Sequence, residues 1–356
     1  MQIEVNSLFF SEKNECIKSD TTNKNKIRVT FYQRRPQEKN FSIERLFADV
    51  RDALPDDIES NLAISRYPSR GFFKRLYNIF EAFFRQGDVN HITGDVHYLS
   101  LLLRKQRTIL TIHDLVSMHR LTGIKKILFF FFWYWLPIQR SAIVTVISEF
   151  TKEELLSFVK VDPDKIRVIY DCVSAKFKPF KKSFNYEKPR ILQVGTGSNK
   201  NVHRLIPALY GINCHLRLIG QLNEEHLNAL QKYHVDFSSV SGISDEEVYQ
   251  EYCQCDIVTF PSTYEGFGLP ILEAMATGRP VVTSSIGPMP EVSGDAACLV
   301  DPFDIEDIRT GIIKVITQPL YREELINRGF ENIRRFRADR IANQYANLYR
   351  DLANSK

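Results

Sequence analysis

FPSTYEGFGLPILEAMATGRPVV, residues 260–282, gives the clearest local indication of the fold. It begins at the end of an apolar strand predicted over residues 257–260 and continues through a glycine-rich loop into a helix predicted over residues 270–277. Pro270 suits the first turn of that helix, because the N–H group that proline lacks has no helical partner there. A second apolar strand, residues 280–284, follows at once. This order of elements predicts a parallel sheet covered by helices.

The loop and the helix start carry groups that suit a sugar joined to a phosphate. Gly266 and Gly268 let the backbone approach a ligand closely, and the unpaired N–H groups of the helix start favour an anion such as a diphosphate. Glu265 precedes the helix, where it can accept hydrogen bonds from sugar hydroxyls, and Glu273 on the helix can hold the two hydroxyls of a ribose. A carboxylate pair that merely complements the helix dipole is the alternative. The neighbouring glycines favour the binding role.

Strands and helices alternate along almost the whole chain, in two sets. The predicted strands are residues 27–32, 61–65, 89–93, 108–112, 142–147 and 167–170 in the first set, and residues 190–194, 215–219, 257–260, 280–284 and 297–300 in the second. A polar stretch without periodicity separates the sets near Pro179 and Pro189. We therefore predict an α/β protein with two Rossmann-like domains facing each other across a cleft. Residues 1–180 would form the first domain and residues 181–335 the second, with a C-terminal helix at 336–356 packing back on the first domain.

Two other loops follow predicted strands, so we expect both at the carboxyl ends of strands, where ligands bind in open α/β sheets. The segment QVGTGSNKNVHRL, residues 193–205, has the strand, glycine turn and helix of a phosphate loop, and Lys200 can neutralise a diphosphate there. A solvated lysine is the alternative. His113 follows the strand 108–112 and can hydrogen-bond a sugar hydroxyl or an acceptor.

These segments resemble the signature of retaining GT-B glycosyltransferases of the family 4 type. The resemblance rests on Glu265-x7-Glu273 within YEGFGLPILEAMATGRPVV, on DIVTFPS before it, on GPMPEVSGDAACLVDPFD after it, and on HDL and SEFT in the first half. It covers about residues 110–350, and it implies that the domain of residues 1–180 binds the acceptor and the domain of residues 181–335 binds the nucleotide-sugar. It implies that Glu265 and His113 are catalytic. It also implies a donor site made of Gly195, Thr196, Lys200, Gly266, Phe267, Gly268, Leu269 and Glu273.

Two further assignments complete the expected site. Gly94 and Asp95, which follow the strand ending at Thr93, are the expected acceptor-binding loop. Ser148 of SEFT reads mainly as a structural helix cap. The family often carries an arginine where this chain has Thr196 and Asn199, and Arg204 is a weak substitute for that second phosphate-binding cation.

The resemblance implies transfer, with retention of configuration, of a hexose or related sugar from GDP-mannose or a UDP-sugar. The acceptor would be a hydroxyl of a glycan or lipid-linked glycan, as in cell-surface polysaccharide assembly. No cofactor and no metal are expected, because cationic side chains and N–H groups can stabilise the diphosphate, and Asp162-Pro163-Asp164 reads as a turn. Two alternatives stay open. One is an NAD-dependent oxidoreductase using VGTGSN, and the other is a non-catalytic protein that keeps the nucleotide-binding fold.

Composition sets the outer limits. The 356 residues are 44% hydrophobic and 25% charged, which excludes wholesale disorder and a polytopic membrane protein. A net charge of +4 is too mild to argue for nucleic acid. Residues 1–180 hold 28 Lys and Arg against 21 Asp and Glu, whereas the remainder has an acidic surplus. The basic half suits an anionic partner such as a membrane surface or a phosphorylated substrate.

Localisation follows from the cysteines, the first residues and two apolar segments. Six scattered cysteines and no recognisable signal peptide in residues 1–15 predict a reduced, cytoplasmic setting. Residues 127–138 are too short to span a bilayer, which takes roughly 20 residues, so they predict a buried or interfacial helix. The helix predicted over residues 72–85 has a Phe-rich face, which we expect to pack on the sheet. The alternative is an interfacial helix that would hold the protein peripherally on the inner face of the membrane.

Overall fold

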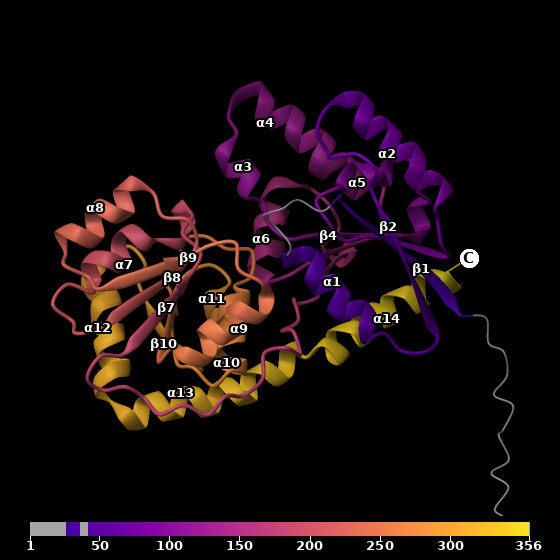
Figure 1. The fold of residues 1–356 in the computed structure, drawn as a ribbon. Helices are drawn as coiled ribbons and strands as arrows, with labels where there is room; N and C mark the ends of the chain where they lie inside the picture. Colours follow the sequence, from indigo (N-terminus) through magenta and orange to yellow (C-terminus); the bar gives the residue numbers. More distant parts are fainter. Residues whose placement is uncertain (1–25, 36–41, 356) are drawn as a thin grey trace, which may run out of the picture.

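Two six-stranded parallel sheets, each covered by helices, form the two halves of the molecule (Figure 1). This computed structural model describes residues 26–35 and 42–355. Cys16 and the first 15 residues, where no signal peptide is expected, lie outside the described residues. The first sheet has the order β2-β1-β3-β4-β5-β6 and the second the order β12-β11-β10-β7-β8-β9.

The strands lie close to the positions that the sequence predicts. In the first sheet they are β1 Ile27–Gln33, β2 Ile58–Ile64, β3 Val89–Ile92, β4 Thr108–Ile112, β5 Ile143–Val146 and β6 Ile166–Val168. In the second they are β7 Arg190–Val194, β8 His215–Ile219, β9 Phe237–Val240, β10 Ile257–Phe260, β11 Val281–Ser284 and β12 Cys298–Val300. Strand β9 is not predicted, because its polar sequence FSSV at a sheet edge lacks an apolar run.

The helices connect successive strands and cover both faces of the sheets. In the first half they are α1 Ser42–Asp52, α2 Phe72–Phe84, α3 Val116–Arg120, α4 Gly123–Phe130, α5 Leu136–Gln139 and α6 Glu149–Phe158. In the second half they are α7 Val202–Ala208, α8 Glu224–Lys232, α9 Asp245–Gln254, α10 Leu269–Ala276, α11 Met289–Ser293, α12 Ile305–Thr317 and α13 Pro319–Asn332. The last helix, α14 Ala338–Asn354, runs back to the first half (Figure 1).

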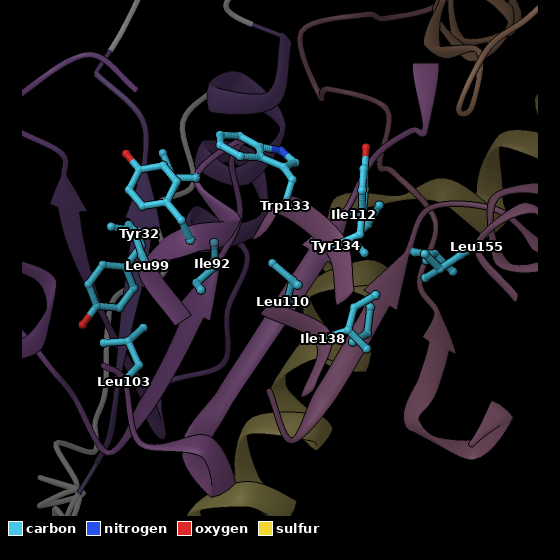
Figure 2. Close-up of a cluster of buried hydrophobic side chains, with 14 of the residues drawn as sticks. Tyr32, Ile92, Leu99, Leu103, Leu110, Ile112, Trp133, Tyr134, Ile138 and Leu155 are labelled. Carbon is cyan, nitrogen blue, oxygen red and sulfur yellow. The ribbon is translucent and has the colours of Figure 1, made fainter. Parts of the chain in front are cut away.

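Each half has its own buried core. In the first half, strand residues such as Ile92 and Leu110 pack against Trp133, Tyr134 and Ile138 of the following helical segment (Figure 2). On the other face of the same sheet, α14 contributes Ile341, Tyr345 and Tyr349 to a core shared with α1 and β1. The C-terminal helix is therefore part of the first half, although it follows the second half in the chain.

The segment after α3 is not the single apolar helix predicted over residues 127–138. It consists of α4, a π turn at Phe131–Trp135 and the short helix α5. Pro137 lies in the first turn of α5, where its missing N–H is tolerated, and the wider π turn precedes it. Between β3 and β4, residues His97–Leu101 form a 3-10 helix.

The prediction that the Phe-rich face of α2 packs on the sheet is wrong. The buried residues of α2 are Asn78, Ile79 and Ala82, whereas Phe80 is 50% exposed and Phe84 is 81% exposed. The buried residues lie at one edge of the broad apolar face, next to the polar side of the helix, so the periodicity identifies the apolar face but not the part of it that is buried. The part of the chain that the structure describes contains no helix long and apolar enough to cross a bilayer.

Candidate active site between the domains

The loop of residues 261–268, which we call the donor loop after its expected role, begins where β10 ends and closes at the start of α10. Gly268 has φ 119° and forms the N-cap of α10, a backbone conformation that glycine adopts without strain. The side chain of Phe267 is buried and packs against Tyr170 and Phe336, so only the backbone of Phe267 faces the loop. Leu269 is the first residue of α10. The N–H groups of this helix start are thus presented beside the loop.

The loop after β7 brings Lys200 to the donor loop. Gly195 has φ 87°, and a Cβ at this position would lie 3.0–3.3 Å from the carbon atoms of Lys200, so glycine makes room for that side chain. Lys200 Nζ lies 2.6 Å from Glu265 Oε1, and Asn199 Nδ2 donates to the same oxygen at 3.2 Å. Thr196 Oγ1 donates to the Gln221 carbonyl and is directed away from this pair. The structure therefore brings together Lys200 and Glu265, which lie 65 positions apart.

Glu273 lies deeper, at the contact between the two halves. Its Oε2 accepts a hydrogen bond from Tyr252 at 2.7 Å, and its Oε1 accepts one from Arg45 of α1 at 3.2 Å. Burial raises the pKa of this carboxyl, and the Arg45 guanidinium opposes that shift. Arg45 also pairs with Asp245 at the start of α9. Sequence reasoning missed Arg45, because nothing near it in the sequence indicates a partner more than 200 positions away.

His113 lies at the end of β4, next to the loop that holds Gly94 and Asp95. Its Nε2 lies 2.9 Å from the Thr93 carbonyl oxygen, which can only accept, so Nε2 carries the proton and Nδ1 is an acceptor. Burial lowers the pKa of His113, which keeps the ring neutral. Asp95 Oδ1 accepts a hydrogen bond from Trp133 Nε1 at 3.0 Å. A Cβ on Gly94 would lie 3.4 Å from the Arg34 backbone nitrogen, so this loop passes close to the end of β1.

The donor loop contacts the first half directly at Gly266. A Cβ on Gly266 would lie 2.1 Å from the His113 carbonyl oxygen, so any side chain would separate the two loops. Ser148 Oγ and Thr151 Oγ1 donate to the Gly266 carbonyl at 2.8 and 3.1 Å. Ser148 also accepts from the Thr151 N–H group as the cap of α6, the role the sequence predicts. The contact with Gly266 is an additional one that the sequence does not reveal.

Two more residues of the second half contact α6. Tyr264, next to Glu265, donates to Glu154 Oε2 at 2.8 Å and accepts from the Leu115 N–H group at 3.3 Å. Glu291 accepts from the Glu149 N–H group at 2.9 Å. The helix start of α6 is therefore a docking point for the donor loop.

The predicted turn at Asp162 is present, because its Oδ1 accepts from the Asp164 N–H group at 2.9 Å. Within residues 26–35 and 42–355, no group of three or more His, Cys, Asp or Glu side chains is arranged to hold a metal ion. The five cysteines of this part of the chain are all free and buried.

The two halves of the chain match two glycosyltransferase family models. Residues 24–177 match the model described as Glycosyltransferase Family 4, and residues 174–332 match the one described as Glycosyl transferases group 1. Together the two matches adjoin and cover residues 24–332.

Curated relatives and solved structures agree with this match. O-antigen chain mannosyltransferase B of Escherichia coli is 38% identical over 108 residues, which cover 30% of this chain and 28% of that protein. O-antigen chain mannosyltransferase RfbU of Salmonella typhimurium is 28% identical over 233 residues, 63% of this chain and 64% of the relative. The chain thus spans less than two thirds of the length of these curated relatives.

The fold is shared with Anabaena HepE in complex with UDP and glucose. Its TM-score is 0.71 at 17% identity, over 91% of this chain and 100% of that chain. The two adjoining family matches and this common architecture lead to one assignment: the chain belongs to the group 1 and family 4 glycosyl transferases and has the GT-B fold.

Proposed function

We propose that this protein is a retaining, metal-independent glycosyltransferase that uses GDP-mannose or a UDP-sugar as donor. The acceptor would be a hydroxyl of a glycan or lipid-linked glycan in cell-surface polysaccharide assembly. The observation that carries the proposal is the Lys200–Glu265 pair, 2.6 Å apart, beside the start of α10. The names of the O-antigen mannosyltransferase relatives favour GDP-mannose as the donor. The complex of HepE with UDP and glucose is the reason to test UDP-sugars as well.

Each group of the site has a role in this reaction. Lys200 and the N–H groups at the start of α10 neutralise the diphosphate leaving group, where negative charge grows in the transition state. Glu265 and the backbone of Gly266–Gly268 hold the transferred sugar, and Glu273 holds the ribose when it exchanges its bond with Arg45. His113 accepts a hydrogen bond from a sugar hydroxyl through Nδ1. The donor's β-phosphate takes the proton of the acceptor hydroxyl, so the reaction needs no protein base.

Hydrolysis of a panel of nucleotide-sugars without acceptor tests the donor and the chemistry. We expect one donor to be cleaved, with no loss of rate in EDTA and with the released sugar in the donor's anomeric configuration by NMR. Glu265→Ala should lower kcat by about 10²-fold or more with the fold intact, whereas Glu225→Ala, an exposed control in α8, should have no effect. Cleavage of none of the donors would favour a non-catalytic protein, and inversion would contradict the retaining mechanism.

We also propose that the protein works in the cytoplasm, attached peripherally to the anionic inner face of the membrane. The support is the exposed aromatic surface of α2 and the surrounding basic residues. Residues 66–85 contain five Lys and Arg and one Glu, and residues 116–148 contain four Lys and Arg and no acidic residue. Each basic residue near an anionic surface adds about 1 kcal/mol to binding. Absence of co-sedimentation with anionic vesicles at low salt would contradict this location.

A further inference from the structure

An apolar groove opens on the first half, between α2, the 3-10 helix His97–Leu101 and the segment formed by α4 and the π turn. Its volume is about 430 Å³, within the range of about 300–1,000 Å³ typical of small-molecule sites. Nine of its ten lining side chains are aromatic or aliphatic, and the tenth is Arg75. The hydrocarbon part of a ligand would fit such a lining, whereas a sugar would find almost no hydrogen-bond partner in it.

The rim of the groove is as apolar as its interior. Phe72 and Leu76 of α2 on one side, and Leu128 and Phe132 on the other, are exposed to solvent although they are large apolar residues. Contiguous exposed apolar surface of this kind usually marks a binding site. The π turn that forms one wall has a geometry that is frequent at functional sites.

Trp133 connects the groove to the acceptor loop. Its ring lines the groove, and its Nε1 donates to Asp95 Oδ1 at 3.0 Å. The His97 ring bonds the Trp133 carbonyl at 2.8 Å, and the next residue, Tyr134, donates to the Asp114 carbonyl beside His113. Trp133 lies at the edge of the buried cluster (Figure 2). The groove therefore lies directly behind the expected acceptor subsite, one side chain away.

Arg75 gives the groove a positive charge. Its guanidinium lies 5.2 Å from the ring centroid of Trp133, and its Nε donates to the Ser69 carbonyl at 3.0 Å. Within the described part of the chain, Arg75 forms no ion pair with a carboxylate. Its charge is therefore not neutralised by a carboxylate there, and a phosphate is an anion that a guanidinium fork binds well.

We infer that this groove binds the hydrocarbon chain of a lipid-linked acceptor, with the anionic head group at Arg75 and the reacting hydroxyl directed past Trp133 toward Asp95 and His113. The inference rests on the proposed function and narrows its acceptor to an amphiphile with a hydrocarbon chain and a phosphate-type head group. It also explains why Trp133 both lines the groove and donates a hydrogen bond to Asp95 of the acceptor loop.

The two tryptophans of the chain, Trp133 and Trp135, allow a direct test by fluorescence. Trp133 lines the groove, whereas Trp135 stacks on Phe131 and is not among the lining residues. The probe is lysophosphatidylglycerol with a brominated chain, used as a monomer, because bromine quenches only a tryptophan that it contacts. In Trp135→Phe, the probe should remove most of the Trp133 emission, and the unbrominated lipid should not. In Trp133→Phe, the monomer should leave the Trp135 emission unchanged.

A matched pair of variants in α2, each made in the Trp135→Phe background, separates the groove from the surrounding surface. Leu76→Gln places an amide among the lining residues and should weaken binding of the monomer about tenfold. Phe84→Gln changes an exposed residue outside the lining and should leave that binding unchanged while it lowers vesicle binding. Hydrolysis of a nucleotide-sugar by the unmodified protein tests the proposed glycosyltransferase activity independently of lipid binding in the groove. Hydrolysis with an unquenched Trp133, or equal quenching of Trp133 and Trp135, would overturn the groove proposal alone.

Discussion

Lys200 and Glu265 hold each other in place at the centre of the candidate site. Both side chains are largely buried, the Lys200 ammonium lies 4.6 Å from the Phe260 ring centroid, and Asn199 donates to the same Glu265 oxygen that Lys200 contacts. A diphosphate bound at Lys200 would compete with Glu265 for the ammonium. The carboxylate would then be released to sugar hydroxyls, so donor binding and sugar recognition would be coupled through one ion pair.

Replacing Lys200 tests its role in phosphate binding. Lys200→Ala should weaken binding of the nucleoside diphosphate by about 1–3 kcal/mol, the size of a charge-assisted hydrogen bond. Binding of the nucleoside should hardly change, because in the proposed site Lys200 contacts only the phosphates. Isothermal titration calorimetry gives both values, with Lys232→Ala, an exposed lysine in α8, as the control. Equal losses for the two ligands would place Lys200 outside the phosphate site.

At the scale of elements, the start of α6 organises the donor loop. Ser148 and Thr151 donate to the Gly266 carbonyl, and Glu291 from α11 accepts from the first N–H group of α6. These contacts are made across the cleft, so they form only when the two halves are close together. They fix the carbonyl next to Glu265 and thereby position the loop that is expected to hold the sugar.

Thr151→Val removes one of the two bonds to Gly266 and keeps the Ser148 cap of α6. We expect kcat to fall about fivefold, the equivalent of one hydrogen bond of about 1 kcal/mol, with little change in the thermal midpoint or in nucleoside diphosphate affinity. Steady-state kinetics and thermal unfolding measure these effects. Ser157→Ala, near the far end of α6, is the control. A variant with normal kcat would show that the contact has no part in turnover.

Helix α2 presents two apolar stripes, one to the core and one to solvent. Ile79 is 8% exposed and lines the base of the groove, whereas its neighbour Phe80 is 50% exposed. The stabilising contribution of an apolar side chain depends on the area it buries on folding. Two adjacent residues of similar hydrophobicity should therefore differ strongly in their effect on stability.

Serine substitutions at these neighbours make the comparison. Ile79→Ser should lower the free energy of unfolding by about 2–4 kcal/mol, as for other truncations in a core. Phe80→Ser should change it by no more than about 0.5 kcal/mol but reduce co-sedimentation with anionic vesicles. Urea denaturation and vesicle sedimentation at low and high salt give the two readouts. A strong loss of stability in Phe80→Ser would mean that the stripe is buried in solution.

At the scale of the whole molecule, α14 is joined to the first sheet by a buried polar chain. His91 of β3 bonds Tyr349 of α14 through Nδ1 at 2.7 Å and Thr111 of β4 through Nε2 at 2.8 Å. Burial lowers the pKa of His91 from 6.5 to about 3. The folded protein thus keeps this ring neutral where the unfolded chain would protonate it. This link between distant segments makes stability depend on pH.

The sign of that dependence follows from the lowered pKa. The stabilisation from neutral His91 is fully present above pH 6.5 and is lost as the pH falls toward 3, because the unfolded chain binds the proton first. Between pH 6.5 and 5 the loss from His91 should be about 2 kcal/mol. Asp171, whose pKa burial raises to about 8, acts in the opposite direction, so only a difference between variants isolates His91.

Urea denaturation of His91→Gln at the two pH values measures this difference. The variant should lose about 2 kcal/mol less than the unmodified protein on acidification, whatever its absolute stability. His234→Gln, an exposed histidine in the second half, should keep the full pH dependence. An unchanged pH dependence in His91→Gln would show that His91 titrates normally in the folded state.

Local patterns in the sequence predict every strand of the two sheets except β9, the parallel direction of both sheets and the family. Strands β4, β7, β8 and β10 have the predicted bounds, because a short apolar run between turn residues is a local signal. The loops with His113, Lys200 and Glu265 were predicted at carboxyl ends for the same reason, since a loop that follows a strand is identified by its neighbours in the chain. The family is identified from Glu265 and Glu273 together with the EGFGLP, EAMA and GRPVV motifs around them and the flanking segments.

Which groups meet across the molecule depends on tertiary packing and could not be predicted from the sequence. It paired Arg45 with Glu273, set Ser148 and Thr151 against Gly266, placed Trp133 between the groove and Asp95, and turned the Phe-rich stripe of α2 outward. The contact of Arg45 with Glu273 and those of Ser148 and Thr151 with Gly266 join residues more than 110 positions apart. All of these features depend on how whole layers of helices and strands pack. Periodicity measures hydrophobicity along one element, whereas burial depends on the surface that another element presents to it.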